Sequence, residues 1–268
     1  MTAPTQHSSF TVTAASLDAM IQDNAPDPSS SAQEIHGADG AVLFSAGRAA
    51  PGYEDIMESL AWKQGLILVS RTSSTGEHLR GYVWMSPQGI VHTSGAATSP
   101  TFTLQAESGG AVFRVLIDML GLQARPAPKK GFEPSRIEER LLWEVVSVEP
   151  GPQHQAREVL ASAVEGIAPD PAAHLRAGEY SVVTATTEFN GVEGQKVGKV
   201  LAIDTPAGLL MHSEERKLLR SVHVLEPTPA WVLLAQLITV MPQPQDISWW
   251  VESLSERRRA GSGSKGLA

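Results

Sequence analysis

The chain contains 268 residues, no cysteine, and an excess of acidic residues that gives a formal net charge of −8. This length allows a substantial core, and the lack of cysteine excludes a disulfide framework, a thiolate nucleophile and a thiolate metal site. The negative charge argues against general binding of nucleic acid or acidic lipid. With no export signal at the N-terminus and no apolar run of ~20 residues, we expect a cytoplasmic protein without membrane insertion.

The sequence pattern of residues 1–123 predicts that the N-terminal half of the fold consists of helices and an antiparallel meander. Residues 10–21 indicate a short strand followed by a helix, with Thr13 as the N-cap. Residues 24–33 are rich in Pro, Ser and Asp and are typical of a loop. Residues 53–64 have the apolar spacing of an amphipathic helix.

Four short apolar segments with short connections follow, and they predict neighbouring antiparallel strands. These strands cover residues 66–71, 79–85, 90–93 and 101–105, and an amphipathic helix over residues 108–120 completes the unit. Tyr82 and Trp84 alternate with apolar residues, so they share one face of the sheet.

The middle of the chain, residues 124–176, predicts a Pro-rich basic connector and then two antiparallel helices. The helices cover residues 133–146 and 153–166, and the second is expected to end before Pro169 and Pro171.

Residues 177–241 predict the second half, again a meander closed by a helix. Trp231, Leu234 and Ile238 recur at helical spacing, so we expect them on the core face of that helix. The remainder, residues 242–268, carries an Arg run in a Gly/Ser-rich context and is expected to be a flexible, basic tail. An amphipathic turn or two just after Pro242, with Ile247, Trp250, Val251 and Leu254, either docks on the body or stays loose.

The two halves contain matching elements at a constant separation. Pro87 and Gly89 correspond to Pro206 and Gly208, 119 residues later, and the strands and helices that follow keep nearly the same offset. We therefore predict an α+β fold of duplicated antiparallel β-meander-plus-helix units with pseudo-two-fold symmetry, flanked by helices.

No catalytic motif is present: the chain has no G-x-S-x-G elbow, H-E-x-x-H pair, phosphate-binding loop or dinucleotide fingerprint. His212 with Glu214 and Glu215 is the His-plus-acid cluster in which a metal could be held, and we favour a solvated surface instead. We expect no enzyme activity, cofactor, metal or small-molecule substrate, and a role in protein binding.

The segment KVLAIDTPAGLLMH at 199–212, the L-E-P-T-P at 225–229 that opens the helix WVLLAQL, and the start FTVTAASLDAM at 10–20 together carry a family resemblance. The chain resembles the EspG family, the cytoplasmic chaperones of type VII (ESX) secretion in actinobacteria. It departs from the family in the extension after Pro242 and in the composition of residues 24–50.

The resemblance implies a chaperone or adaptor that binds the helical tip of PE–PPE-like heterodimers and delivers them to the secretion machinery. It implies a partner-binding surface made of a sheet face, the hairpin loop after the second strand and part of a C-terminal helical bundle, here residues 231–240. The residues carried over in this way are Thr72, Ser73, Ser74, Thr75, Gly76, Glu77, His78, Tyr82 and Trp84.

The loop over residues 72–78 contains several hydroxyl residues and Gly76 but no apolar anchor, so we expect it to be mobile. The alternative function is a non-catalytic interaction or regulatory module built on the same duplicated fold.

Overall fold

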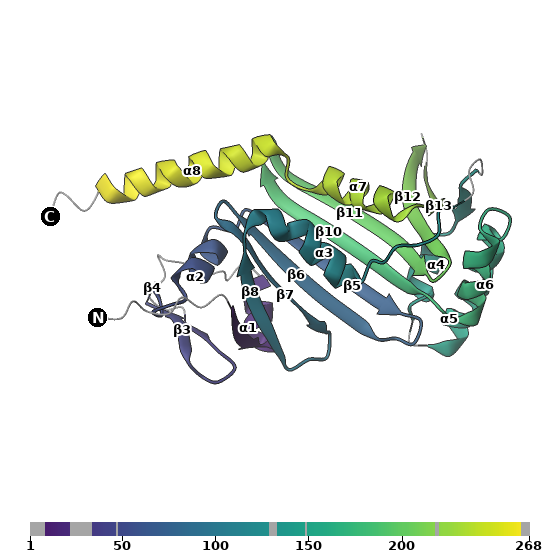
Figure 1. The fold of residues 1–268 in the computed structure, drawn as a ribbon, viewed down its shortest axis with the longest axis horizontal. Helices are drawn as coiled ribbons and strands as arrows, with labels where there is room; N and C mark the ends of the chain where they lie inside the picture. Colours follow the sequence, from purple (N-terminus) through teal and green to yellow (C-terminus); the bar gives the residue numbers. More distant parts are fainter. Residues whose placement is uncertain are drawn as a thin grey trace.

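The computed structural model describes residues 9–21, 34–46, 48–128, 133–147, 149–217 and 220–263. Over these residues the chain forms a ten-stranded antiparallel sheet, a separate three-stranded sheet, and helices on both faces of the larger sheet (Figure 1). The predicted α+β class with a large antiparallel sheet is confirmed.

The chain begins with strand β1 (Ser9–Thr13) and helix α1 (Ala14–Ile21). As predicted, Thr13 caps this helix, because its Oγ1 accepts a hydrogen bond from the backbone N–H of Ser16 at 3.1 Å. The predicted loop at residues 24–33 lies outside the described residues. The next elements are β2 (Glu34–His36), β3 (Val42–Ser45), β4 (Arg48–Ala49) and α2 (Glu54–Ala61).

The first meander has the predicted strand order and a closing helix. The buried side chains of that helix are Val112, Val115, Leu116 and Leu120, so its predicted apolar face is confirmed. The elements are β5 (Gly65–Ser73), β6 (His78–Ser86), β7 (Gly89–Ala96), β8 (Thr101–Glu107), the short 3-10 helix η1 (Gly109–Ala111) and α3 (Val112–Leu120).

The described residues in the middle of the chain form a short strand and three helices. The predicted helix over residues 153–166 corresponds to α5, which ends before Pro169 as expected, whereas only Arg140–Glu144 of residues 133–146 is α-helical and the third helix was not predicted. Pro169 and Pro171 lie in the first turn of that third helix, where a missing N–H costs no hydrogen bond. The elements are β9 (Ser135–Ile137), α4 (Arg140–Glu144), α5 (Pro150–Val164) and α6 (Pro169–Ala177).

The second meander repeats the strand-and-helix order of the first and then continues into a further helix. The elements are β10 (Ser181–Gly191), β11 (Gly194–Thr205), β12 (Gly208–Lys217), β13 (Arg220–Thr228), α7 (Ala230–Val240) and α8 (Pro244–Gly263).

Helix α8 occupies most of the segment predicted to be a flexible tail, and that prediction is wrong for Pro244–Gly263. Two side chains attach the helix to the β10–β11 hairpin. The indole Nε1 of Trp250 donates to the carbonyl of Asn190 at 2.6 Å, and the buried carboxylate of Asp246 accepts from the N–H of Val192 at 3.0 Å. Beyond this attachment α8 projects from the body (Figure 1).

The strand order of the large sheet is β1-β8-β7-β6-β5-β10-β11-β12-β13-β9. The two meanders meet where β5 pairs with β10 in continuous register, from Gly65 opposite Phe189 to Ser73 opposite Ser181. The predicted N- and C-terminal halves therefore share one sheet.

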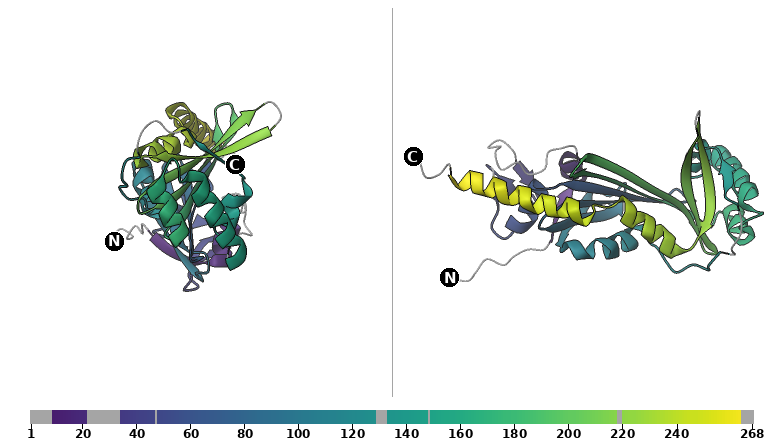
Figure 2. Two further views of the ribbon diagram at one scale, coloured as in Figure 1. Left: turned by 90° about the vertical axis from the view of Figure 1, so that its right-hand side faces the viewer. Right: turned by 90° about the horizontal axis from the view of Figure 1, so that it is seen from above.

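Three hydrophobic cores lie on the two faces of this sheet. On the face we call the front, α3, α7 and Trp250 of α8 pack on both meanders. On the back face, one core lies under α1 and α2 and a separate core lies under α4, α5 and α6. Figure 2 shows the helices distributed over both sides of the sheet. No helix in the described part of the chain is long and apolar enough to cross a membrane.

The core face of α7 differs from the prediction. Leu233 and Leu237 are buried and Leu234 packs on the core as predicted, whereas Trp231 is 68% exposed and Ile238 is 51% exposed. Nearly every residue of this helix is apolar, so the sequence pattern could not determine which side faces the sheet.

Candidate functional site

The back face of the sheet is open between its two helical cores, along the strands where the halves meet. We call this region the sheet strip. The register of β5, β10 and β11 forms rows across the sheet: Glu188 lies between Leu66 and Val197, Thr186 lies between Leu68 and Lys199, and Ser70 is paired with Thr184. The strip consists of Leu66, Leu68, Ser70, Thr184, Thr186, Glu188, Val197 and Lys199.

The strip is exposed because the helices on the back face stop on either side of it. Leu201 and Val182 are buried under α4, α5 and α6, whereas Leu68 is 39% exposed although it lies in a central strand, and Val197 is 70% exposed. Exposed apolar side chains on a central part of a sheet that no helix covers are typical of a surface that binds another molecule.

Hydrogen bonds and a ring contact fix the polar side chains of the strip. The hydroxyls of Ser70 and Thr184 are 2.7 Å apart, and Glu188 accepts a hydrogen bond from Gln195. The ammonium of Lys199 lies 4.5 Å from the ring centroid of Trp143 in α4, in cation–π geometry. The strip thus combines apolar side chains with preorganised polar groups.

A polar cavity of about 390 Å³ adjoins one end of the strip. Leu66 and Glu188 line it together with Lys63, Gln64 and Gln195. The strip therefore continues into a hollow beside α1 rather than ending on a flat surface.

The hairpin predicted to contact a partner lies at the other end of the strip. Thr72 and His78 face each other across β5 and β6, with Thr72 Oγ1 hydrogen-bonded to His78 Nδ1 at 2.7 Å. Arg80 Nε donates to His78 Nε2 at 3.1 Å. Burial, and then the charge of Arg80, lower the pKa of His78, so its neutral ring accepts this bond.

The tip of this hairpin is tied to the second half of the chain. The N–H of Ser74 donates to Tyr180 at 3.1 Å, its hydroxyl donates to the carbonyl of Gly178, and its carbonyl accepts from Gln153 of α5 at 2.7 Å. Thr75 and Glu77 are exposed, Ser73 and Gly76 half-buried. The expectation of a loop without anchors therefore does not hold at Ser74.

Tyr82 and Trp84 lie on the predicted face but are not available to a partner, so these two site predictions are wrong. Tyr82 is 7% exposed and Trp84 is 1% exposed, because α1 and α2 cover them. The register places them directly opposite Leu68 and Leu66. The exposed part of this face is shifted from β6 to β5, β10 and β11.

Sequence reasoning missed the strip residues of β10, although the sequence carries a signal for them. Thr184, Thr186 and Glu188 alternate with Val183, Ala185, Thr187 and Phe189 in a single segment, and Thr187 is the one polar residue of the second set. Polar residues at every second position of a strand indicate that one face meets water.

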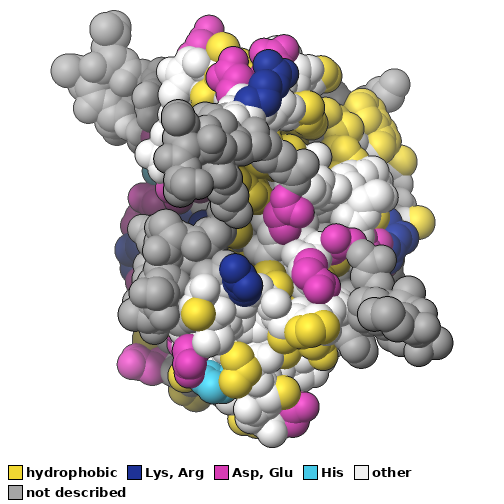
Figure 3. All heavy atoms as spheres, turned by 90° about the vertical axis from the view of Figure 1, so that its left-hand side faces the viewer, with side chains coloured by type: hydrophobic (Ala, Val, Ile, Leu, Met, Phe, Trp, Pro, Cys, Tyr) yellow, Lys and Arg dark blue, Asp and Glu magenta, His cyan; other side chains and the backbone are white. Residues whose placement is uncertain are grey.

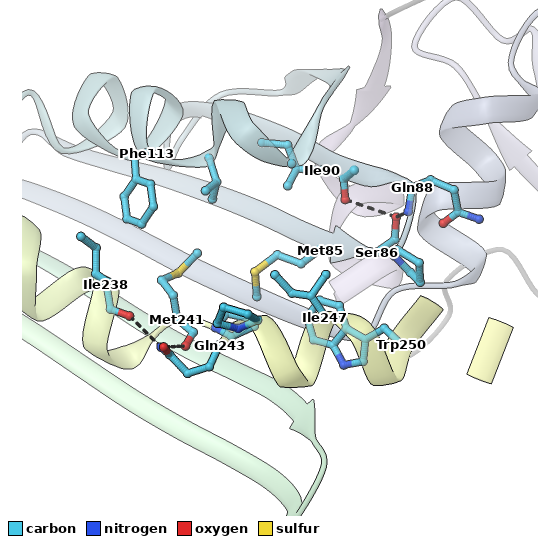
Figure 4. A pocket seen from close by; sticks show the side chains of 16 residues that line it. Met85, Ser86, Gln88, Ile90, Phe113, Ile238, Met241, Gln243, Ile247 and Trp250 are labelled. Carbon is cyan, nitrogen blue, oxygen red and sulfur yellow. Dashed lines mark hydrogen bonds between the residues drawn. The ribbon is translucent and has the colours of Figure 1, made fainter. Parts of the chain in front are cut away.

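A second apolar surface lies on the front face, between α3 and the junction of α7 and α8. This α3–α8 groove has a volume of about 490 Å³, and Figure 4 shows Phe113, Ile238 and Ile247 around it. Ile238 is 51% exposed and Ile247 is 45% exposed. In Figure 3, hydrophobic side chains gather at this end of the molecule on the side that carries α3, α7 and α8.

The groove and α7 lie on the opposite face of the sheet from the strip and the hairpin. The structure therefore does not bring residues 231–240 together with the predicted sheet face. The helices that border the strip on the side of the second half are α4, α5 and α6.

His212 makes a side-chain pair rather than a metal site. Its Nε2 is 3.0 Å from Nδ1 of His223, and burial, then His223 and Lys199, lower the pKa of His212. Within the described residues no group of three or more His, Asp or Glu side chains could hold a metal ion.

Comparison with known proteins gives a likeness of fold. No family model and no curated protein matches the chain. Among solved structures, a match is the structure of the Mycobacterium tuberculosis type VII secretion system chaperone EspG5 in complex with the PE25–PPE41 dimer. The TM-score is 0.52 at 11% sequence identity, and the alignment covers 87% of this chain and 95% of the matched chain.

Proposed function

We propose that this protein is a cytoplasmic chaperone or adaptor of type VII (ESX) secretion that binds helical PE–PPE-like heterodimers. The fold likeness to EspG5 extends over most of both chains, which supports a shared architecture. The observation that carries the proposal is the sheet strip, an exposed surface with apolar residues at the centre of the molecule, where Leu68 and Val197 are accessible.

The proposed binding surface is the sheet strip together with the adjoining hairpin, residues 72–78. A helical tip laid on the strip would bury Leu68 and Val197, and Thr75 and Glu77 would contact it from the hairpin. Burial of exposed apolar area stabilises such a complex by about 25 cal/mol per Å², before the cost of association.

We also propose that the two meander-plus-helix units arose by duplication and are related by pseudo-two-fold symmetry. Four strands and a closing helix occur in the same order in each half. The strip would then lie on the pseudo-symmetry axis, since it spans the β5–β10 pair.

The test is co-expression with PE–PPE pairs encoded in the same genome, followed by co-purification and a binding isotherm. Val197→Glu and Leu68→Glu are expected to abolish binding without changing the thermal melt. Trp231→Glu is the matched control, because Trp231 is 68% exposed and Val197 is 70% exposed, on opposite faces of the sheet.

Ile238→Glu distinguishes the strip from the α3–α8 groove. Loss of binding with this variant, and full binding with Val197→Glu, would place the partner on the front face. A wild-type protein that binds no PE–PPE pair would contradict the secretion role and favour the alternative, an interaction or regulatory module with another partner.

A further inference from the structure

Two cations, Arg80 and Lys199, lie on either side of the apolar centre of the strip, although the whole chain has a formal net charge of −8. Lys63 lies beside one end of the strip, and the nearby acids are Glu188 in the strip, Glu77 on the adjoining hairpin, and Glu139 and Glu214 near His212. Glu188 already accepts a hydrogen bond from Gln195. The strip therefore carries charges of both signs, with its two cations on opposite sides.

Lys199 is held in place without a carboxylate partner. Within the described residues it takes part in no ion pair, and its ammonium lies over the ring of Trp143 at 4.5 Å. Trp143 is 47% exposed, so the pair stands at the surface of the strip. A cation fixed over an aromatic ring loses little side-chain freedom when it meets a carboxylate.

Arg80 lies on the other side of the strip and, like Lys199, has no carboxylate partner among the described residues. Its Nε donates to His78. Its strand neighbour is Ser70, whose hydroxyl bonds to Thr184. Arg80 is exposed, and its remaining N–H donors make no hydrogen bond to a described residue, so they are available to a partner.

The strands that carry these two cations are about as far apart as a helix is wide. Arg80 and Lys199 lie on β6 and β11, three strand spacings apart, which is about 14 Å between the strands, and in neighbouring rows of the sheet. A helix with its side chains is about 10–12 Å wide. A helical tip centred on Leu68 would therefore have one cation on each side.

We propose that the sheet strip selects helical partners whose apolar tip is flanked by carboxylates, and that Lys199 and Arg80 recognise those carboxylates. This inference rests on the proposed function and specifies its partner. Charged residues at the edge of an interface control the association rate and its salt dependence, so these are the quantities to measure.

The test uses the full chain and the PE–PPE pair identified by co-expression. Lys199→Glu and Arg80→Glu are each expected to weaken binding by about tenfold or more, mainly through slower association. Lys199→Met is expected to have a smaller effect. The affinity of the wild type should fall as salt rises, and the double variant should lose most of that dependence. Arg136→Glu is the control, because it changes the net charge equally at exposed β9.

The outcomes separate this inference from the function on which it rests. If Val197→Glu abolishes binding while Lys199→Glu and Arg80→Glu bind as the wild type does, the strip is the site but the recognition of carboxylates is wrong. The inference is also overturned if Arg136→Glu weakens binding as much as Lys199→Glu, since the effect is then one of overall charge. If Val197→Glu binds normally, the proposed site itself is wrong.

Discussion

Ser86 and Thr205, 119 residues apart in the chain, make the same hydrogen bond in two matching turns. The hydroxyl of Ser86 donates to the carbonyl of Gly89 at 3.2 Å, and that of Thr205 donates to the carbonyl of Gly208 at 2.8 Å. The two glycines have φ angles of 155° and 156°. Such agreement in local geometry is what the proposed duplication requires, and an experimental structure in which residues 79–120 and 199–240 have different topologies would contradict it.

The two turns differ in how tightly they are packed, and this predicts unequal effects of alanine. A Cβ on Gly89 would lie 2.4 Å from the carbonyl oxygen of Glu107, whereas the nearest atom to a Cβ on Gly208 is 3.5 Å away. Gly208→Ala is expected to cost about 1–2 kcal/mol through backbone strain alone. Gly89→Ala should cost more, and denaturant unfolding of both variants measures the difference. Equal costs would show that the first turn relaxes.

Trp231 of α7 and Trp250 of α8 provide a test of how these two helices pack. Trp250 is 3% exposed and packs edge-on to Phe189, with ring centroids 6.4 Å apart. Trp250→Ala is therefore expected to destabilise the fold by about 3–5 kcal/mol. Trp231→Ala should change the unfolding free energy by less than about 0.5 kcal/mol, because Trp231 is mostly exposed. Thermal melts of the two variants measure which substitution destabilises the fold more. A larger loss with Trp231→Ala than with Trp250→Ala would mean that α7 is rotated so that Trp231 faces the sheet.

Asp246 predicts a pH dependence at the start of α8. Its carboxylate accepts from the backbone N–H groups of Val192 and Gln243 at 3.0 Å, and Lys196 lies 3.1 Å away. Burial raises the pKa of Asp246, but these two N–H donors and Lys196 outweigh burial and leave the pKa below its usual value. A carboxyl with a depressed folded-state pKa stabilises the protein above pH ~4 and loses this effect as the pH falls below that value.

Asp246→Asn is accordingly expected to cost about 2 kcal/mol at pH 7. The difference from the wild type should shrink between roughly pH 5 and pH 2, measured by denaturant unfolding across that range. A constant difference over the whole range would show that Asp246 acts through packing and not through its charge.

Arg125 predicts a strong coupling between the connector and the second meander. Its Nε and Nη2 each lie 2.7 Å from an oxygen of Asp204, whose side chain is 3% exposed. Arg125→Met leaves that carboxylate buried without its partner and is expected to cost about 3–5 kcal/mol. A double-mutant cycle with Asp204→Asn measures the coupling, and a value near zero would contradict a direct interaction.

The parts of the fold that could be predicted are those where the sequence pattern has one solution. Helix α3 is apolar on one side, so Val115 and Leu116 could be placed on the sheet from spacing alone. Helix α7 is apolar all round, and the orientation of Trp231 depends on the β11 surface beneath it. The sequence indicated an amphipathic turn or two around Trp250, but neither the length of α8 nor its attachment could be predicted, because the groups that hold it, Asn190 and Val192, lie in a distant hairpin.

The residues of the candidate site could also be predicted only where the local sequence pattern determines their position. The alternation of Tyr82 and Trp84 placed them on one face of the sheet, which is also the face of the strip, but their burial comes from α1 and α2, which no local pattern reveals. The sequence of the hairpin tip is polar and indicates no anchor, yet Ser74 donates hydrogen bonds to the carbonyls of Gly178 and Tyr180, which are distant in the chain. Contacts between distant segments therefore decide which predicted residues remain at the surface.

The pairing of β5 with β10 has a consequence for the timing of assembly during synthesis. Leu68 and Thr186 are neighbours in the strip but 118 residues apart in the chain, so neither half alone displays the surface. At 5–20 residues per second, a ribosome needs roughly 6–24 s to make the intervening segment. Nascent chains should therefore remain unable to engage a partner until the second meander has emerged and paired, which makes binding competence a late event that reports completion of the whole sheet.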